Sequence, residues 1–333
     1  MRLLAAALFV ALAAPAYAQH AGHHAHEALP TKAAHEHAAH AHGRAAASDA
    51  LDAQARAQLA LVARAVERYR DVRVAERVGW APSAIGGEDS PLMGEHWSRR
   101  DAKELRADAP FDPAAFNTLQ YAWVNGRREL VGVSYVVRIA PGEALPAGFA
   151  GDADHWHVHD VEKAFAAMTE ERPVLRALGN WWLDANYRDK GDTRSRLAMV
   201  HAWVPVQSPD GPFAMDNVAL PYLRLGLPVA WATAGDSDAA NGINLATATG
   251  CKVALDGRLW IANATQRQRR AMHEACRTQA ETVRAGIAAS DAARANAVAR
   301  KAWRSLQATF AATLDARQMQ RIAAITEHDP IGH

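Results

Sequence analysis

Three histidines stand at alternate positions in the segment HWHVHD. In an extended strand, successive side chains point to opposite faces, so His155, His157 and His159 would project from the same face. Several imidazoles buried side by side leave polar nitrogens unsatisfied, and a metal ion removes that cost. The spacing therefore predicts a strand whose imidazoles bind a transition-metal ion.

Two further histidines are candidate ligands from other parts of the chain. In the segment LAMVHAWVP, a period of two places His201 on the same strand face as Met199. His96 follows a glycine-containing loop in the segment LMGEHW. Acidic side chains near these histidines could supply an oxygen ligand, and neighbouring side chains could also hold an imidazole in one tautomer without touching the ion. The candidates for this supporting role are Glu95, Asp160, Glu162 and Trp203.

The same histidines are compatible with two alternative roles. The histidines of residues 155–159 could lie on a solvated strand face, with His201 hydrogen-bonded in the core of a structural or binding protein without metal. Alternatively, three ligands could leave an open position for water or dioxygen, as in a mononuclear metalloenzyme with oxidoreductase or hydrolase activity. In such an enzyme Glu95 or Glu162 would move protons.

Five segments together resemble a group of exported bacterial proteins. The segments are ERYRDVRVAERVGW, PLMGEHW, RRELVGVSYVV, HWHVHD and MVHAWVPVQSPDGPFAMDN. The group shares an MGxH loop, and an HxW strand followed by PxGxFA; some members also carry a WHxH segment. The resemblance covers roughly residues 60–217 and leaves His155 outside the shared segments. The resemblance implies that four histidines belong to one site, namely His96, His157, His159 and His201. It implies no activity for that site.

The histidine segments are also similar to the cupin pattern, in which an HxH pair, a glutamate and a later histidine bind a metal inside a small barrel. His157, His159, Glu162 and His201 could be aligned with that pattern. However, Glu162 lies too close to the HxH pair, and the expected glycines and prolines are missing. Cupin-like chemistry is therefore a minor alternative.

The composition of the first 47 residues predicts a signal peptide followed by a disordered tail. Residues 1–18 combine Arg2, an apolar run and small residues before Gln19, which predicts a signal peptide and a periplasmic or secreted protein. Residues 19–47 are rich in alanine and contain eight histidines, which predicts a disordered tail that binds metal weakly. A tract without any role is the alternative. No later segment offers the roughly 20 apolar residues of a membrane span, so we expect no membrane insertion.

Composition and the absence of certain sequence motifs argue against several other classes of function. The chain has 333 residues, 50% of them hydrophobic, and a formal net charge of +1. This balance argues against broad electrostatic binding of nucleic acid. No GxSxG motif or phosphate loop occurs. The two cysteines, Cys251 and Cys276, predict a disulfide in an oxidising compartment, because no CxxC spacing indicates thiolate ligands.

Periodicity predicts an α+β fold with a small antiparallel sheet. A long helix should start at Ser48 or Asp49 and break near residues 70–71. The dipeptide Asn125-Gly126 predicts a hairpin between alternating strands. The other expected elements are strands at 154–160 and 196–206, a helical insertion at 162–195, and C-terminal helices capped by Thr265 and by Ser290 or Asp291.

This organisation predicts two folded regions after the tail, an α+β domain at 48–230 that carries the histidine site and a mainly helical region at 231–333. Together the patterns predict an exported transition-metal-binding protein whose ligand is copper or zinc. Metal ions are the predicted partners, and no particular protein partner is indicated.

Overall fold

The structure is a computed structural model of the chain. It describes residues 51–83, 87–99, 105–140, 142–151, 153–186, 196–288, 291–326 and 329–330. The predicted signal peptide and the histidine-rich tail lie outside these ranges. The boundary predicted near residue 230 stays a prediction.

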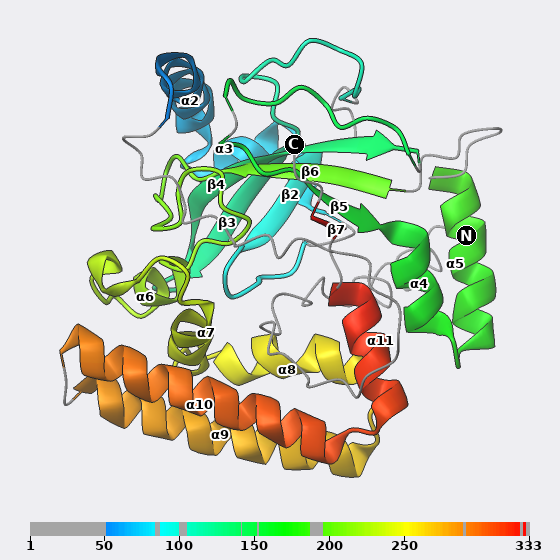
Figure 1. Ribbon diagram of the computed structural model, residues 1–333, viewed down its shortest axis with the longest axis vertical. Helices are drawn as coiled ribbons and strands as arrows, with labels where there is room; N and C mark the ends of the chain where they lie inside the picture. Colours follow the sequence, from blue (N-terminus) through cyan, green and yellow to red (C-terminus); the bar gives the residue numbers. More distant parts are fainter. Residues whose placement is uncertain are drawn as a thin grey trace, which may run out of the picture.

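A seven-stranded antiparallel sheet lies at the centre of the fold, which confirms the predicted α+β class (Figure 1). The strand order is β1-β2-β3-β4-β6-β5-β7. The strands are β1 (Trp80–Pro82), β2 (Glu95–Arg99), β3 (Thr118–Val124), β4 (Arg127–Ile139), β5 (His157–Asp160), β6 (Arg196–Ala202) and β7 (Asp329–Pro330).

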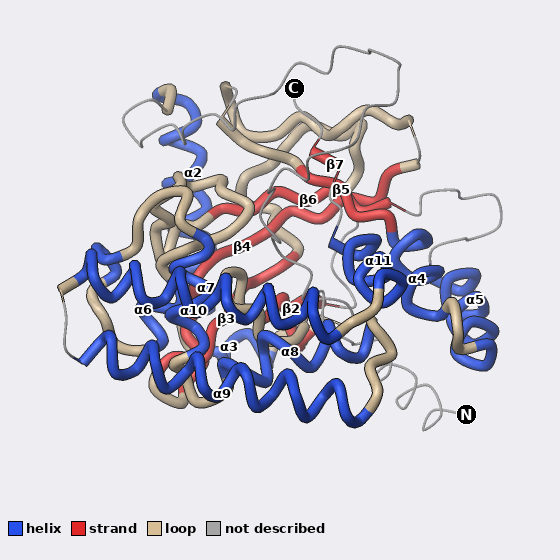
Figure 2. The backbone as a smooth tube through the Cα atoms, turned by 60° about the horizontal axis from the view of Figure 1, so that its bottom comes forward, coloured by secondary structure: helices blue, strands red, loops and turns tan. Residues whose placement is uncertain are grey.

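Helices lie on both sides of this sheet. Figure 1 shows α2 and α3 in its upper part and α7, α8, α9 and α10 below the sheet. The long helices α9 and α10 run side by side, and they come to the front in Figure 2. The helices are α2 (Ala53–Val66), η2 (Glu67–Tyr69), α3 (Val72–Arg77), α4 (Val161–Thr169), α5 (Pro173–Asn186), α6 (Leu220–Arg224), η3 (Val229–Trp231), α7 (Ser237–Leu245), α8 (Gly250–Ile261), α9 (Gln266–Ala288), α10 (Ala292–Thr313) and α11 (Ala316–Thr326).

The predicted N-terminal helix is divided into two, and a capping aspartate begins each part. The carboxylate of Asp52 accepts a hydrogen bond from the third amide along, so the cap differs from the predicted Ser48 or Asp49. Asp71 caps α3 in a similar way, which places the break where the sequence predicted it. Asp291 caps α10, as one of the two predicted candidates.

The predicted hairpin joins β3 to β4. Asn125 and Gly126 both have positive φ, 49° and 76°, as a tight two-residue turn requires. A bulge between Gln120 and Tyr121 shifts the register of this pair. Because of the bulge, Val131 packs against Trp203 instead of sharing the cluster of the later β4 valines.

One face of the sheet packs on α2, η2 and α3, and we call it the apolar face. The hydroxyl of Tyr121 donates to the backbone carbonyl of Tyr69 at 2.6 Å, which ties the sheet to η2. Burial of these side chains supplies most of the stabilisation of this half of the molecule. The face is defined by Trp97, Leu119, Tyr121, Val133, Tyr135, Val137, Val158, Ala198, Val200 and Ala202.

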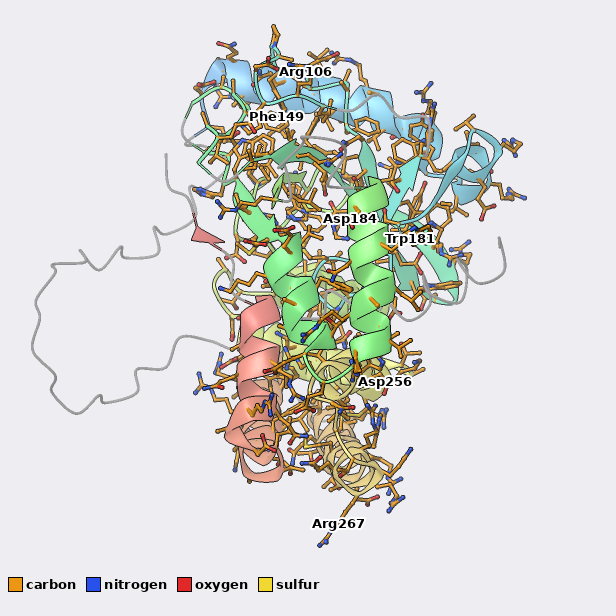
Figure 3. The ribbon with its side chains drawn as sticks, turned by 90° about the vertical axis from the view of Figure 1, so that its right-hand side faces the viewer. Arg106, Phe149, Trp181, Asp184, Asp256 and Arg267 are labelled. Atoms are coloured by element: carbon orange, nitrogen blue, oxygen red, sulfur yellow. A yellow bond between two sulfur atoms is a disulfide. The ribbon has the colours of Figure 1, made fainter. Side chains whose placement is uncertain are left out.

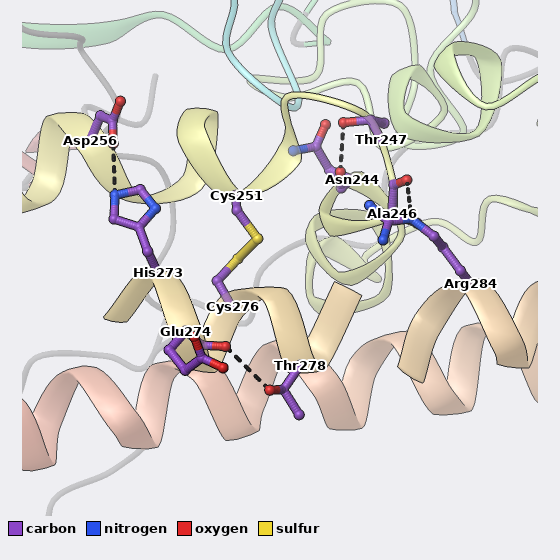
Figure 4. Close-up of a disulfide and its surroundings, with 10 residues drawn as sticks. All are labelled: Asn244, Ala246, Thr247, Cys251, Asp256, His273, Glu274, Cys276, Thr278 and Arg284. Atoms are coloured by element: carbon purple, nitrogen blue, oxygen red, sulfur yellow. Dashed lines mark hydrogen bonds and ion pairs between the residues drawn. A yellow bond between two sulfur atoms is a disulfide. The ribbon is translucent and has the colours of Figure 1, made fainter. Parts of the chain in front are cut away.

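A disulfide links two of the helices that follow the sheet. Cys251 of α8 and Cys276 of α9 form a disulfide across 25 residues, which confirms the predicted pair (Figure 4). Helix α5 carries Trp181, which is 60% exposed, and Asp184 on the side seen in Figure 3. Within the described ranges, no helix combines the length and apolar character needed to cross a membrane.

Candidate metal centre

Histidines from three strands lie on the face opposite the apolar face. Cα partners in an antiparallel sheet present their side chains on the same face. His96 pairs with Gln120, Ser134 pairs with His201, and His157 pairs with Met199, two positions from His201. Segments far apart in the chain therefore converge on one surface. We call it the histidine face, defined by His96, His157, His159 and His201.

The four rings form a continuous row. The ring centre of His201 lies 5.8 Å from that of His96 and 5.2 Å from that of His157. The ring of His159 follows, 4.9 Å from His157. His96, His157 and His201 are 5%, 1% and 0% exposed, whereas His159 is only half-buried. The row thus runs from a half-buried imidazole to fully buried ones.

Polar side chains surround His201 at the centre of the row. Its Nδ1 lies 2.9 Å from Nε2 of Gln120 and 3.2 Å from Oγ of Ser134. The indole of Trp203 stacks parallel to the imidazole, with ring centres 5.4 Å apart. These contacts hold the imidazole ring in one plane, as partners of a metal-binding histidine commonly do.

Gly132 makes this close packing possible. A Cβ atom at this position would lie 2.7 Å from Oε1 of Gln120 and 2.8 Å from a ring carbon of Trp203. The indole of Trp203 is itself fixed, since its Nε1 donates to the carbonyl of Ala214 at 2.6 Å. Any larger residue at 132 would therefore displace a neighbour of His201.

Glu95, predicted to support the histidines, takes part in a different network. It precedes His96 in β2, so alternation sends its side chain to the apolar face. Its carboxylate accepts hydrogen bonds from Nε1 of Trp97 at 2.8 Å and Nε1 of Trp123 at 2.7 Å. Nε of Arg128 donates to the same carboxylate at 2.7 Å. Glu95 is thus a buried, charge-paired anchor of the hairpin.

The other predicted residues lie at the start and end of β5 and in the first turn of α4. Asp160 ends β5 and caps α4, accepting from the amide of Lys163 at 2.8 Å. Glu162 lies in the first turn of α4. His155 precedes β5 and is exposed. Of the four predicted supporting residues, Trp203 is the one with a ring contact to the row.

Gln120 and Ser134 were not predicted from the sequence as members of the site. Alternation within the hairpin could have identified them. If the apolar residues of β3 and β4 face one side of the sheet, Gln120 and Ser134 must face the other side. Both are fully buried. A buried amide and a buried hydroxyl at paired positions on one sheet face indicate polar partners on the neighbouring strand, because buried polar groups need hydrogen bonds.

The spacing of the rings can be compared with metal coordination. Two imidazoles that bind one ion at about 2.1 Å hold their ring centres roughly 4.5 to 6 Å apart. The two spacings around His201 lie within this range. In the described part of the chain, however, no three His, Cys, Asp or Glu side chains are arranged to hold an ion as they stand. Coordination by three of these residues would require imidazole rotation.

Comparisons of the chain with known protein families, with curated proteins and with solved structures give no match. The resemblance to a group of exported bacterial proteins therefore stays a prediction.

Proposed function

We propose that this chain binds one transition-metal ion, copper or zinc, on the histidine face. The supporting observation is the row of buried imidazoles that three separate strands bring together. Each buried imidazole has two ring nitrogens to satisfy, so a packed group of them is a costly way to fill a core. An ion that accepts lone pairs from several rings offsets this cost.

His201 and His157 are the first pair of ligands in this proposal. Their ring centres lie 5.2 Å apart, a spacing that suits one shared ion, but the two rings are stacked in parallel planes. At least one of the two imidazoles must therefore rotate before both lone pairs can reach the ion. His96, with its ring centre 5.8 Å from that of His201, becomes the third ligand after side-chain rotation. Strand positions need not change, because the Cα atoms of all three residues are fixed by the sheet ladder.

His159 is the ligand that first meets the ion. It is the half-buried member of the row, and its ring centre lies 4.9 Å from that of His157. An ion held there can move to His157 by exchange between neighbouring imidazoles, without an intermediate position free of ligands. The gradient of burial along the row thus supports inward transfer of the ion.

Copper and zinc both suit a set of imidazoles. Met199, the Cα partner of His157, adds a thioether on the same face of the sheet. Because thioethers favour Cu(I), an affinity for Cu(I) that falls in Met199→Leu while zinc affinity is unchanged would identify copper as the preferred ion.

We propose metal storage or transfer rather than catalysis. Glu95, the carboxylate next to His96 in the chain, is occupied by two indoles and one guanidinium on the apolar face. This arrangement leaves Glu95 unable to act as the general base of a metalloenzyme, which supports binding over catalysis. The predicted signal peptide at 1–18 supports binding outside the cytoplasm, in the periplasm or after secretion.

The test is metal analysis of untagged protein with and without the predicted tail at 19–47. We expect one tightly bound copper or zinc per chain in both forms, and loss of this ion in the double variant His157→Ala, His201→Ala. The control is His273→Ala, since His273 is a half-buried residue of α9 that contacts Asp256 (Figure 4). A double variant that folds by circular dichroism and keeps its metal would refute the proposal.

A further inference from the structure

The amide of Gln120 makes two contacts through the same nitrogen. Nε2 lies 3.3 Å from the backbone carbonyl oxygen of Met93 and 2.9 Å from Nδ1 of His201. A carbonyl oxygen can only accept a hydrogen bond, so the amide must turn its NH2 group toward Met93. The same NH2 group then faces the imidazole.

This orientation decides where His201 carries its proton. An NH2 group donates to Nδ1 only if that nitrogen has a free lone pair. A neutral imidazole has one N–H, so the proton must then be on Nε2. The hydroxyl of Ser134, 3.2 Å from Nδ1, can rotate to donate or to accept, and it therefore follows the choice made by the amide.

Binding of an ion through Nε2 needs the opposite tautomer. The proton must move to Nδ1, where an acceptor is required to hold it. A half-turn of the Gln120 amide supplies this acceptor by exchanging Oε1 for the NH2 group. The half-turn gives up the longer of the two contacts, that to Met93. A Cβ atom at Gly132 would lie only 2.7 Å from Oε1, so the glycine removes a side chain that would block this turn.

We propose that Gln120 is a positioning residue that sets the tautomer of His201, and that its amide turns over when the ion binds. The first half of the proposal holds for the metal-free protein alone. The second half rests on the proposed metal-binding function. Gln120 lies at the centre of the sheet and is fully buried, so its effect on the ion passes through His201.

The tautomer can be measured in the metal-free full chain by nitrogen-15 NMR of labelled histidine, with the His201 signals assigned by their absence in His201→Gln. We expect a protonated Nε2 in the wild type and a protonated Nδ1 in Gln120→Glu, because a carboxylate only accepts. Ser134→Ala, the milder change, should keep the wild-type tautomer. A protonated Nδ1 in the wild type, or a change of tautomer in Ser134→Ala, would overturn the inference.

Zinc affinity tests the second half with the same full-length proteins. Gln120→Glu should bind zinc about 10-fold more tightly than the wild type, since the acceptor for Nδ1–H is already in place. Gln279→Glu on α9 adds the same charge on a different element and should leave the affinity unchanged. If zinc binds to neither protein while the tautomers behave as expected, metal binding fails and the role of Gln120 stands. If the wild type binds zinc but Gln120→Glu changes neither tautomer nor affinity, the role of Gln120 fails.

Discussion

The two faces of one sheet are equally buried in this protein but differ in chemistry. Leu119 and Gln120 are neighbours in β3, and Ser134 and Tyr135 are neighbours in β4, yet each pair divides between the faces. All four side chains are fully buried. Burial of the apolar members is favourable, whereas burial of the polar ones has to be offset by hydrogen bonds. Equal burial can therefore mark stability on one face and binding on the other.

The largest expected effect is the loss of an aromatic ring from the apolar face. The ring of Tyr135 packs against Phe111 at 4.9 Å and Phe149 at 5.5 Å between ring centres. Tyr135→Ala should lower the free energy of unfolding by about 3 to 5 kcal/mol, as measured by urea denaturation. Tyr135→Phe keeps the ring and should lose about 1 kcal/mol. Equal losses in the two variants would contradict a packing role.

The next effect is expected in the C-terminal helices. Cys251 and Cys276 close a loop between α8 and α9. The double variant Cys251→Ser, Cys276→Ser should lose about 3 kcal/mol, because the unfolded chain regains the entropy that the crosslink removed. Reduction of the wild-type protein should give a loss of similar size. If the metal content is unchanged after reduction, the disulfide stabilises the helices without affecting the proposed metal site on the histidine face.

On the histidine face, we expect a substitution to change the free energy of unfolding by a smaller amount and in the opposite direction. His157 is 1% exposed, and leucine at this position would bury an apolar side chain with no ring nitrogens to satisfy. We expect His157→Leu to leave the free energy of unfolding of the metal-free protein unchanged, or to raise it by about 1 kcal/mol. The same variant should lose metal. A loss of stability as large as that of Tyr135→Ala would mean that the histidine face is a structural core.

The smallest effect concerns ion pairs that join the end of α4 to α11, which we call the clamp. Hydrogen bonds from Arg317 and Arg321 of α11 lower the pKa of the Glu170 carboxyl, which follows α4. A lowered pKa in the folded state contributes stability above the usual glutamate pKa of about 4.3, and this contribution is lost as pH falls through the folded-state pKa. Unfolding measured between pH 6 and pH 3 should therefore show a smaller acid-induced loss in Glu170→Gln.

A matched variant makes this last comparison specific. Glu281→Gln on α9 removes the same charge from an exposed position. It should follow the wild-type pH dependence more closely than Glu170→Gln does. Identical curves for the two variants would show that the clamp between α4 and α11 has no measurable effect.

Local patterns in the sequence were sufficient for much of the fold. The turn at Asn125-Gly126, the cap at Asp291 and the Cys251–Cys276 pair follow from residue types that few conformations accommodate. The bulge at Gln120 could not be predicted, because register depends on contacts between strands. Strict alternation along β4 would place Val131 on the same face as Val133, and the bulge is the reason why it packs with Trp203 instead.

The candidate site was predicted in part for the same reason. Alternation within single strands indicated that His157 and His159 share a face and that His201 follows the same pattern. Which strands are neighbours is a property of the whole sheet, so the partners of His201 could not be identified. Alternation also places Glu95 and His96 on opposite faces once both lie in a strand, whereas the sequence suggested a loop.

The separation of the hydrogen-bond partners along the chain has a kinetic consequence. Gln120 and Ser134 belong to a hairpin with a two-residue turn, but Ser134 and His201 are 67 positions apart. Contacts between near neighbours in the chain form sooner than those that close long loops. The hairpin is therefore expected early, and the imidazole of residue 201 reaches it late. A partly folded chain then carries all four histidines of the row but has not brought them together.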